Sequence, residues 1–357
     1  MRETRQTTDQ PQRRVLLCGY YGEHNLGDDA LLEVLLGQLP AHCRATVTAH
    51  DTALVEERFG VETVPRRRLA LVLKALGRCD ALVLGGGSLL QDSTSFRSLL
   101  YYATLIGAAR LEGKPVLLWG QGLGPLRRRR SRLLVGRLLR LVTAVSWRDS
   151  ESAALARRLG REGPVGSDPV WALPPQPWRG TGGPLVLCFR PTKLLQGSAW
   201  GPYLAAVDQL AASQEREVIW LPFHRDQDQS LFDQLQQQGL VGAALARRSR
   251  VVEATTPSEA MALFRSASLV LAMRLHALIL AALAGSPVSA LSYDPKVQAC
   301  ATELGCSCLD LADASPAAAA LLGSWMEAFE HPPALASLQA MAQATGLHRA
   351  LLTTLEA

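Results

Sequence analysis

The sequence predicts an α/β protein made of two doubly wound domains. Short apolar runs alternate along the chain with segments of helical length, which is the pattern of β-α-β units around a parallel sheet. A stretch rich in proline and glycine, from Leu173 to Pro184, interrupts this alternation near the middle and is the expected domain boundary. A chain of 357 residues is also longer than one ordinary hydrophobic core supports.

The first domain is expected over residues 14–172, and each of its predicted strands is a short apolar run followed by glycine or a polar loop. A helix capped by Asp28 or Asp29 should follow the first strand, because an aspartate there can accept free backbone N–H groups. The strands are predicted at Arg14–Cys18, Ala81–Leu84, Pro115–Trp119 and Thr143–Trp147, with further helices at Leu99–Leu111 and Ser150–Leu159.

The second domain is expected over residues 184–315, where the same rhythm restarts. Residues 316–357 read as helical and could pack back across both domains. Two Rossmann-like domains joined by a short linker indicate a cleft, and ligands of such sheets bind beyond the carboxyl ends of the strands. The predicted strands are Leu185–Phe189, Val218–Leu221, Leu269–Ala272 and Val288–Leu291, and the predicted helices are Tyr203–Ala212, Pro257–Arg265 and Leu275–Leu283.

Composition excludes several classes of protein. The net charge of +5 is mild, and no basic face with interleaved aromatics is visible, so nucleic acid is not an expected partner. The polar N-terminus lacks the apolar core of a secretory signal. The longest apolar stretch, Leu275–Leu291, contains Gly285-Ser286-Pro287 and falls short of a membrane span. We therefore expect a cytoplasmic protein.

The cysteines favour a reducing compartment. Seven cysteines, an odd number, do not look like a disulfide framework in a chain of this size. Cys306 and Cys308 form a C-x-C, but no matching pair or histidine cluster accompanies them. Buried free thiols are the better interpretation, and we expect no metal.

The loop after the first strand, Gly19 to Asp29, lacks the glycine spacing of a dinucleotide site. Two carboxylates stand at the start of its helix, where a bound pyrophosphate requires amide donors instead. Asn25 and Asp28 suit sugar hydroxyls better than phosphate, and Asp28 could act as a base on such a hydroxyl. The alternative for either aspartate is a plain helix cap.

Two further loops of the first domain carry candidate ligand-binding groups. Gly85-Gly86-Gly87-Ser88 follows a strand, so its backbone amides could approach an anion, although triple glycine also serves ordinary turns. Gln91 and Asp92 add polar groups to this loop. Arg148 ends another strand and can hold carboxylate or phosphate through two parallel hydrogen bonds, and the alternative is a simple pair with Asp149.

Met273-Arg274-Leu275-His276 is the sharpest feature of the second half. It joins a strongly apolar strand to a helix that is apolar all round, so Arg274 and His276 should face a cleft. The next strand ends in a loop that carries Lys296. Arg274, His276 and Lys296 could converge on one anionic ligand, although a lone histidine beside an apolar face is often structural.

The basic run Arg127 to Arg130, with Arg132, is most simply a solvated segment. A role in steering an acidic polymer or in peripheral contact with lipid head groups at the inner face of a membrane is the alternative.

Taken in order, six motifs resemble the polysaccharide pyruvyl transferase family, and most nearly its bacterial CsaB type. They run from Gly19 to Lys296, so the resemblance covers most of the chain. Asp29 stands where the family would have glutamate, and tryptophan within SWRD is a second small departure. The motifs are GYYGEHNLGDDALL, LGGGSLLQDSTSFRSLLYY, GQGLGP, SWRDSESAALARRLG, SDPVW and MRLHALILAALAGSPVSALSYDPK.

The resemblance implies a glycosyltransferase-B-like fold and transfer of a pyruvyl group from phosphoenolpyruvate to a sugar, with no nicotinamide or other cofactor. It implies that Arg148, His276 and Lys296 serve the donor. On this hypothesis Arg274, Gly86, Gly87 and Ser88 also contact the donor, and Asn25, Asp28, Gln91 and Asp92 contact a glycan or lipid-linked acceptor. Two alternatives remain open: a nucleotide-sugar glycosyltransferase of the same fold, and a non-catalytic glycan- or anion-binding protein.

Overall fold

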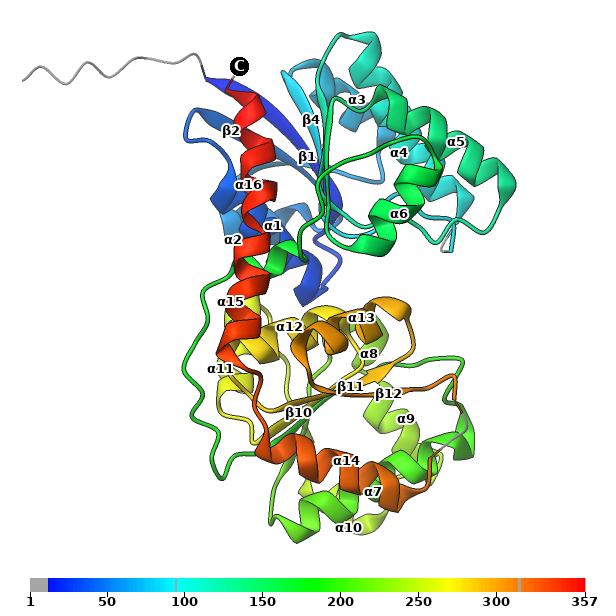
Figure 1. Cartoon of the computed structure of the whole chain (residues 1–357), viewed down its shortest axis with the longest axis vertical. Helices are drawn as coiled ribbons and strands as arrows, with labels where there is room; N and C mark the ends of the chain where they lie inside the picture. The colour runs from blue at the N-terminus through cyan, green and yellow to red at the C-terminus, as the bar shows by residue number, and fades with distance from the viewer. Residues whose placement is uncertain (1–11, 94, 314–315, 357) are drawn as a thin grey trace, which may run out of the picture. The chain divides into compact units, whose positions relative to one another are not determined.

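The computed structural model describes residues 12–93, 95–313 and 316–356 (Figure 1). The polar N-terminal segment, in which we found no apolar core of a secretory signal, lies largely outside these residues. Contacts divide the chain into two compact units. Of the described residues, unit 1 comprises those within 12–23, 31–169 and 344–356, and unit 2 comprises those within 24–30 and 170–343.

Unit 1 contains a parallel sheet in the order β3-β2-β1-β4-β5-β6, which is the doubly wound order around a switch point between β1 and β4. Helices α3, α4 and α5 lie together on one face of this sheet (Figure 1). The strands are β1 (Arg13–Tyr21), β2 (Cys43–Ala49), β3 (Glu62–Pro65), β4 (Ala81–Gly85), β5 (Val116–Gln121) and β6 (Ala144–Trp147). The helices are α1 (Leu26–Gln38), α2 (Thr52–Phe59), α3 (Leu69–Gly77), α4 (Phe96–Leu111), α5 (Arg129–Leu141), α6 (Ser150–Arg158) and α16 (Gly346–Leu352). Residues 26–30, at the start of α1, belong to unit 2.

Unit 2 repeats the architecture with the order β12-β11-β10-β7-β8-β9, again parallel, and its switch point lies between β7 and β10. Its strands are β7 (Leu185–Cys188), β8 (Val218–Trp220), β9 (Ser249–Val251), β10 (Leu269–Ala272), β11 (Val288–Ser292) and β12 (Ser307–Asp310). Its helices are α7 (Gly201–Ser213), α8 (Arg225–Asp228), α9 (Leu231–Gln237), α10 (Ala243–Arg248), α11 (Pro257–Arg265), α12 (Leu275–Leu283), α13 (Pro295–Leu304), α14 (Ala318–Glu330) and α15 (Leu335–Ala344), and a 3-10 turn, η2, spans Gly197–Trp200.

The central strands are apolar because both of their faces are covered by helices. Every residue of β4, β5, β7, β10 and β11 is buried, as a parallel sheet between two helical layers requires. The fold is therefore two Rossmann-like domains, as predicted. No helix within the described ranges combines the length and apolarity needed to cross a bilayer.

The prediction that Asp28 or Asp29 caps the first helix is wrong. Helix α1 begins at Leu26, so both aspartates lie inside its first turn. The side-chain Oδ1 of Asn25 accepts the N–H of Gly27 at 3.1 Å, which gives asparagine the role expected of aspartate. Asp149, by contrast, does cap α6, because its carboxylate accepts the N–H of Ser152 at 2.6 Å.

The stretch from Leu173 to Pro184 forms no regular element beyond a final backbone turn. Contacts place the division between the units slightly earlier, at Pro169 and Val170. The irregular stretch belongs to unit 2, since the N–H of Gln176 donates to the carbonyl of Leu283 at 2.7 Å.

Candidate functional site

In unit 2, polar side chains gather at the carboxyl ends of four neighbouring strands. Arg190 follows β7, the segment from His224 to Asp228 follows β8, Arg274 follows β10, and Tyr293 follows β11. Because these strands are parallel neighbours, their following loops meet at one edge of the sheet. We call Arg190, His224, Gln227, Asp228, Arg274 and Tyr293 the strand-end cluster.

A buried ion pair forms the base of the cluster. Arg274 is 9% exposed and Asp228 is 4% exposed. The guanidinium of Arg274 donates from Nε to Oδ2 of Asp228 at 3.0 Å and from Nη2 to Oδ1, which is the paired geometry that fixes both groups. The backbone N–H of His224 also donates to Oδ2 of Asp228, at 2.8 Å. Arg274 thus holds the loop after β8 in place, and its charge is compensated.

Arg190 has a different environment. Its Nη1 donates to the hydroxyl of Tyr293 at 2.8 Å, and its guanidinium carbon lies 4.7 Å from the centroid of the Tyr293 ring. Its other hydrogen bonds go to the carbonyl of Pro191 and to Oε1 of Gln227, which also accepts from Arg274. Within the described residues, every hydrogen bond of Arg190 therefore goes to a neutral oxygen. Its half-buried positive charge remains available to an anion.

His224 is buried beside these two arginines. Its residue is 5% exposed, and neither ring nitrogen has a hydrogen-bond partner among the described residues. Burial, together with the positive charge of Arg274, lowers the pKa of His224 below its ordinary value, although Asp228 and Asp226 act in the opposite direction. The imidazole is therefore neutral at physiological pH.

His276 belongs to the same unit as two of the predicted acceptor residues, Asn25 and Asp28, whereas Gln91 and Asp92 lie in unit 1. His276 lies in the first turn of α12, and Gly27 in the first turn of α1 packs so closely on it that a Cβ atom would overlap the imidazole. Asn25, two residues before this glycine, donates from its side-chain amide to Oδ2 of Asp28. The structure thus brings the segment with Asn25 and Asp28 to the ring of His276, as a shared ligand site would require.

Backbone hydrogen bonds fix this segment against the loop after β8. The N–H of Leu26 donates to the carbonyl of Phe223 at 3.1 Å, and the N–H of Arg225 donates to the carbonyl of His24 at 2.9 Å. His24 has φ of 51°, in the left-handed region that a non-glycine residue rarely adopts. This strained turn is therefore fixed by one backbone hydrogen bond at His24 and another at Leu26.

Lys296 lies in the first turn of α13. The carboxylate of Asp294 accepts its backbone N–H at 3.1 Å and caps that helix. Lys296 is half-buried and shares its loop with Tyr293 of the strand-end cluster. Its role in binding the donor stays a prediction.

In unit 1, Arg148 is held by three side chains. Its guanidinium donates to Asp168 at 3.1 Å, to Ser88 at 3.2 Å and to Asp149 at 3.4 Å. Arg148 is 6% exposed, and a Cβ atom at Gly122 would approach its Nε to 2.8 Å. Because two carboxylates already surround the guanidinium, these contacts favour a positioning role for Arg148 on the loop that carries Ser88.

The glycine-rich loop after β4 has the backbone geometry that glycine permits. Gly86 and Gly87 have φ of 69° and 66°. Their carbonyl groups accept from the side-chain amide of Gln121, and the N–H of Gly122 donates to the carbonyl of Gly87 at 2.7 Å. This loop is therefore tied to β5 through its carbonyl groups.

Asp92 serves the fold of unit 1. Its carboxylate accepts the N–H groups of Arg127 and Arg128 at 2.8 and 2.9 Å, and it is 6% exposed. Burial acts to raise its pKa, but these backbone donors and Ser131 outweigh burial and lower the pKa of Asp92 below its ordinary value. Oε1 of Gln91 accepts the N–H of Ser93 at 2.8 Å. Both side chains are engaged in local contacts.

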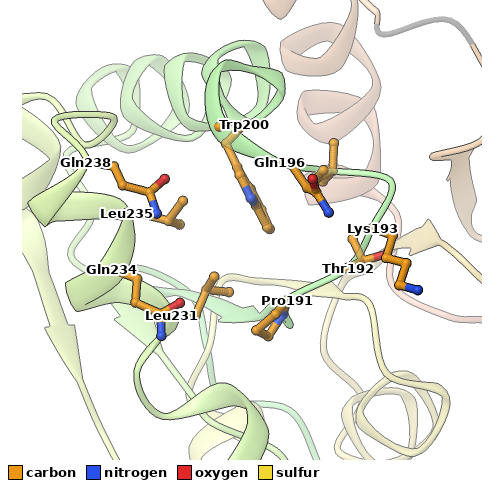
Figure 2. A pocket seen from close by; sticks show the side chains of 11 residues that line it. Pro191, Thr192, Lys193, Gln196, Trp200, Leu231, Gln234, Leu235 and Gln238 are labelled. Atoms are coloured by element: carbon orange, nitrogen blue, oxygen red, sulfur yellow. The ribbon is translucent and has the colours of Figure 1, made fainter.

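In unit 2, a cavity of about 390 Å³ opens beside the loop that follows β7 and carries Arg190 of the strand-end cluster (Figure 2). Trp200 points into it between Gln196 on one side and, on the other, Gln234 of α9 and Gln238, which directly follows α9. Lys193 is the one charged side chain among its described lining residues. Amides that both donate and accept, around an aromatic ring, suit a neutral ligand rich in hydroxyl groups.

The described residues contain no group of three or more histidine, cysteine or carboxylate side chains arranged to hold a metal ion. The Sγ of Cys308 donates to Oε1 of Gln298 at 3.1 Å. Burial raises the pKa of Cys306 to about 12 and that of Cys308 to about 11, so both thiols are protonated at neutral pH.

Sequence reasoning missed Arg190, His224 and Asp228 in unit 2 and Asp168 in unit 1. The available signal was position: Arg190 directly follows the predicted strand Leu185–Phe189, and His224 comes shortly after Val218–Leu221. Asp168 lies in the motif SDPVW, which gave it no role, and Asp228 had no signal, because it is recognisable only through the arginine that it contacts.

Comparisons with solved structures agree with the fold. The chain is similar to a UDP-N-acetylglucosamine 2-epimerase from Rickettsia bellii, with a TM-score of 0.61, 11% identity and coverage of 97% of this chain and 96% of that one. The chain is also similar to Anabaena HepE in complex with UDP and glucose, with a TM-score of 0.57, 14% identity and coverage of 96% of this chain and 95% of that one. It is similar to Acinetobacter baumannii MurG as well, with a TM-score of 0.52, 14% identity and coverage of 96% of this chain and 99% of that one. At these identities the likeness shows the glycosyltransferase-B-like fold alone.

At the level of sequence, none of the curated proteins matches the chain. The family described as polysaccharide pyruvyl transferase matches residues 25–295, which is well over half of the chain. This range includes Asn25, Arg148, Arg190 and His276 and ends one residue before Lys296, so the match spans most of the candidate site residues in both units. The chain therefore belongs to the polysaccharide pyruvyl transferase family.

Proposed function

We propose that the protein transfers the pyruvyl group of phosphoenolpyruvate to a sugar of a cell-surface or cell-wall polysaccharide, or of its lipid-linked precursor, as a ketal. Family membership gives the reaction class. The observation that carries the proposal is the strand-end cluster, in which the charge of Arg190 has no carboxylate partner among the described residues while that of Arg274 does. Phosphoenolpyruvate, with a carboxylate and a phosphate, is an anion that such a group can hold.

The chemistry requires an acid, a base and anion binding. A proton adds to the methylene carbon, a first sugar hydroxyl attacks the resulting cation, and a second hydroxyl attacks as the bond from carbon to the phosphate oxygen breaks. The two hydroxyl protons balance the one taken by the methylene carbon and the one that leaves with phosphate. In the proposal His276 donates the proton or stabilises departing phosphate, and Asp28 orients or deprotonates the acceptor.

Donor binding is assigned mainly to unit 2. Arg190 and Lys296 bind the two anionic groups, and Arg274 holds the loop after β8 through Asp228. In unit 1, Arg148 positions Ser88, and its predicted direct contact with the donor stays a proposal, as do those of Gly86 and Gly87. No cofactor is needed, because phosphoenolpyruvate itself supplies the carbon group and the leaving group.

For the acceptor, the side chains of Asn25 and Asp28 remain the proposed contacts near His276. Asp92 and Gln91 were also predicted there, and their engagement in local hydrogen bonds makes them the weaker candidates. The cavity of Figure 2 is proposed to hold a further neutral sugar unit of the glycan, because its amides match hydroxyl groups.

Thermal-shift titration with phosphoenolpyruvate and with a panel of nucleotide sugars tests the donor. Phosphoenolpyruvate should raise the melting temperature of the wild-type protein, and Arg190→Ala should abolish this shift. The matched control is Arg247→Ala, an exposed arginine of α10, which should keep the shift. Stabilisation by a nucleotide sugar together with indifference to phosphoenolpyruvate would instead identify a glycosyltransferase.

Phosphate release from phosphoenolpyruvate in the presence of a panel of oligosaccharides tests turnover. His276→Gln should lower the rate by about a hundredfold or more while retaining the thermal shift, which is the range expected for removal of an acid catalyst. His331→Gln, a change at an exposed histidine, should leave the rate unchanged. Ligand-induced stabilisation without product under every donor and acceptor would favour a non-catalytic binding protein.

A further inference from the structure

Helix α5 of unit 1 presents an unusual surface. Seven arginines lie between Arg127 and Arg140, and the sequence contains no aspartate or glutamate from Lys114 to Arg148. Among the described residues, none of these seven arginines forms an ion pair. We call six exposed side chains of α5 the α5 surface: Arg129, Arg130, Leu133, Arg137, Arg140 and Leu141. Arg132 is exposed too, but its guanidinium donates to the carbonyl groups of Leu126 and Arg127 and is not counted.

These six side chains share one face of the helix. At the α-helical rotation per residue they fall within an arc of about 120°. The opposite arc holds Ser131, Val135, Leu138 and Leu139, all of which are buried against the unit. The orientation of α5 is therefore fixed by packing, and its basic arc faces solvent.

Two leucines sit inside this basic arc. Leu133 is 58% exposed and Leu141 is 40% exposed. Exposure of these leucines to water is unfavourable, because apolar surface is more stable when it is removed from water. At a bilayer the same leucines can enter the boundary between head groups and acyl chains. A polyanion in solution offers no such apolar layer, and the arc lacks the aromatic side chains on which nucleobases stack.

The start of the surface is rigid. The carboxylate of Asp92 accepts the backbone N–H groups of Arg127 and Arg128, and the guanidinium of Arg130 lies 4.2 Å from the centroid of the Phe96 ring. Both anchors come from the chain preceding or beginning α4, which packs against α5. These contacts already order the start of α5, so binding to a flat partner does not have to order it first.

We infer that the α5 surface binds membranes that contain anionic lipids, with its arginines on the head groups and Leu133 and Leu141 inserted between them. Such a surface would keep the protein at a membrane that bears a lipid-linked sugar. The inference stands on charge and exposure alone, and its test requires no phosphoenolpyruvate, so it can succeed or fail independently of the proposed reaction.

Vesicle flotation tests the inference directly. The full chain should float with vesicles of equal parts phosphatidylcholine and phosphatidylglycerol, and should not float with phosphatidylcholine alone. Raising the salt concentration should weaken the binding, because the attraction of surface arginines to anionic lipid is screened. Equal binding to both vesicle types, or no binding to either, would overturn the inference.

Two double variants separate the contributions of charge and insertion. Arg137→Glu with Arg140→Glu should lower the partition coefficient by at least about tenfold. Leu133→Ser with Leu141→Ser should lower it by at least about threefold, through loss of apolar burial. The matched controls in unit 2 are Arg247→Glu with Arg248→Glu on α10 and Leu335→Ser on α15, all exposed, and they should bind as wild type.

Circular dichroism confirms that each variant is folded before it is compared. If the charge variant loses binding while the leucine variant binds as tightly as wild type, and heparin competes fully with the vesicles, the α5 surface recognises polyanions in general and the membrane assignment falls. If the control variants lose as much binding as the α5 variants, the interaction is diffuse, and the assignment to α5 is equally overturned.

Discussion

At the scale of single residues, Gly27 occupies the position where a side chain would displace His276. It lies in a helix, where alanine is normally preferred to glycine by about 1 kcal/mol, so its presence opposes local propensity. The overlap involves the ring atoms and the Cβ of His276, which cannot swing away as the tip of a long chain could. The absence of a side chain therefore serves the placement of the imidazole.

Gly27→Ala should consequently lower phosphate release by at least about tenfold, because displacement of a catalytic group by about an ångström costs that much or more. Gly37→Ala in the same helix is the matched control, since apart from its chain neighbours and the nearby backbone of α1 no described atom lies within 4 Å of the added Cβ. It should retain activity and gain a fraction of a kilocalorie per mole from helix propensity. Wild-type turnover by Gly27→Ala would show that the position of His276 does not matter.

At the scale of elements, the strand-loop-helix rhythm was readable for most strands that are buried on both faces. Strand β2 was missed although five of its residues are buried, because an arginine and two threonines interrupt its apolar run. The spans predicted at Pro257–Arg265, Leu269–Ala272 and Leu275–Leu283 match α11, β10 and α12 residue for residue. The edge strands β3, β9 and β12 were missed, because at most one residue in each is fully buried and their sequences lack a continuous apolar run.

The candidate sites were only partly readable for a related reason. Position after a strand singled out Arg148, Arg274 and His276, and Arg190 satisfied the same rule. Whether a guanidinium is compensated depends on carboxylates distant in sequence: Asp228 lies 46 residues from Arg274, and Asp168 lies 20 residues from Arg148. Such pairings follow from tertiary packing, so sequence pattern alone could not separate a ligand-binding arginine from a structural one.

The cavity beside α9 yields a prediction at this scale. Gln234→Ala with Gln238→Ala removes two amides from its wall while leaving the inward leucines of α9 in place. If a neutral sugar unit binds there, the KM for an oligosaccharide acceptor should rise several-fold with kcat nearly unchanged, because remote binding energy is lost without disturbing the reacting groups. Gln236→Ala, an exposed change on the same helix, is the control. Equal KM values would remove the cavity from acceptor binding.

At the scale of the whole molecule, C-terminal helix α16 completes the core of unit 1. His348 is fully buried, and its ring nitrogens lie 2.8 Å from the hydroxyl of Ser146 and 2.8 Å from the carbonyl of Ser167. Burial lowers the pKa of His348 below its ordinary value, although the bond to Ser167 and the charge of Asp168 act in the opposite direction. Asp168 in turn pairs with Arg148, so the C-terminus supports a loop that is distant in sequence.

Each unit thus buries one neutral histidine, His224 in unit 2 and His348 in unit 1, and several thiols. The unfolded chain takes up a proton at these histidines as the pH falls below 6.5, their ordinary pKa, while the folded chain does not. Stability should therefore decrease below about pH 6.5. Burial also raises the pKa of Cys18 and Cys188 above 9.0, so above that pH the unfolded chain loses thiol protons first and stability should decrease again.

The expected result is a stability plateau between about pH 6.5 and about pH 9. Urea unfolding under reducing conditions measures it, with the midpoint of each transition followed separately because two units need not unfold together. His348→Asn should reduce the loss of stability of unit 1 on the acid side of this plateau. Cys188→Ala should reduce the loss of stability of unit 2 on its alkaline side. If stability still falls as steeply with decreasing pH in both His348→Asn and His224→Asn, then carboxylates, and not buried imidazoles, govern stability in this pH range.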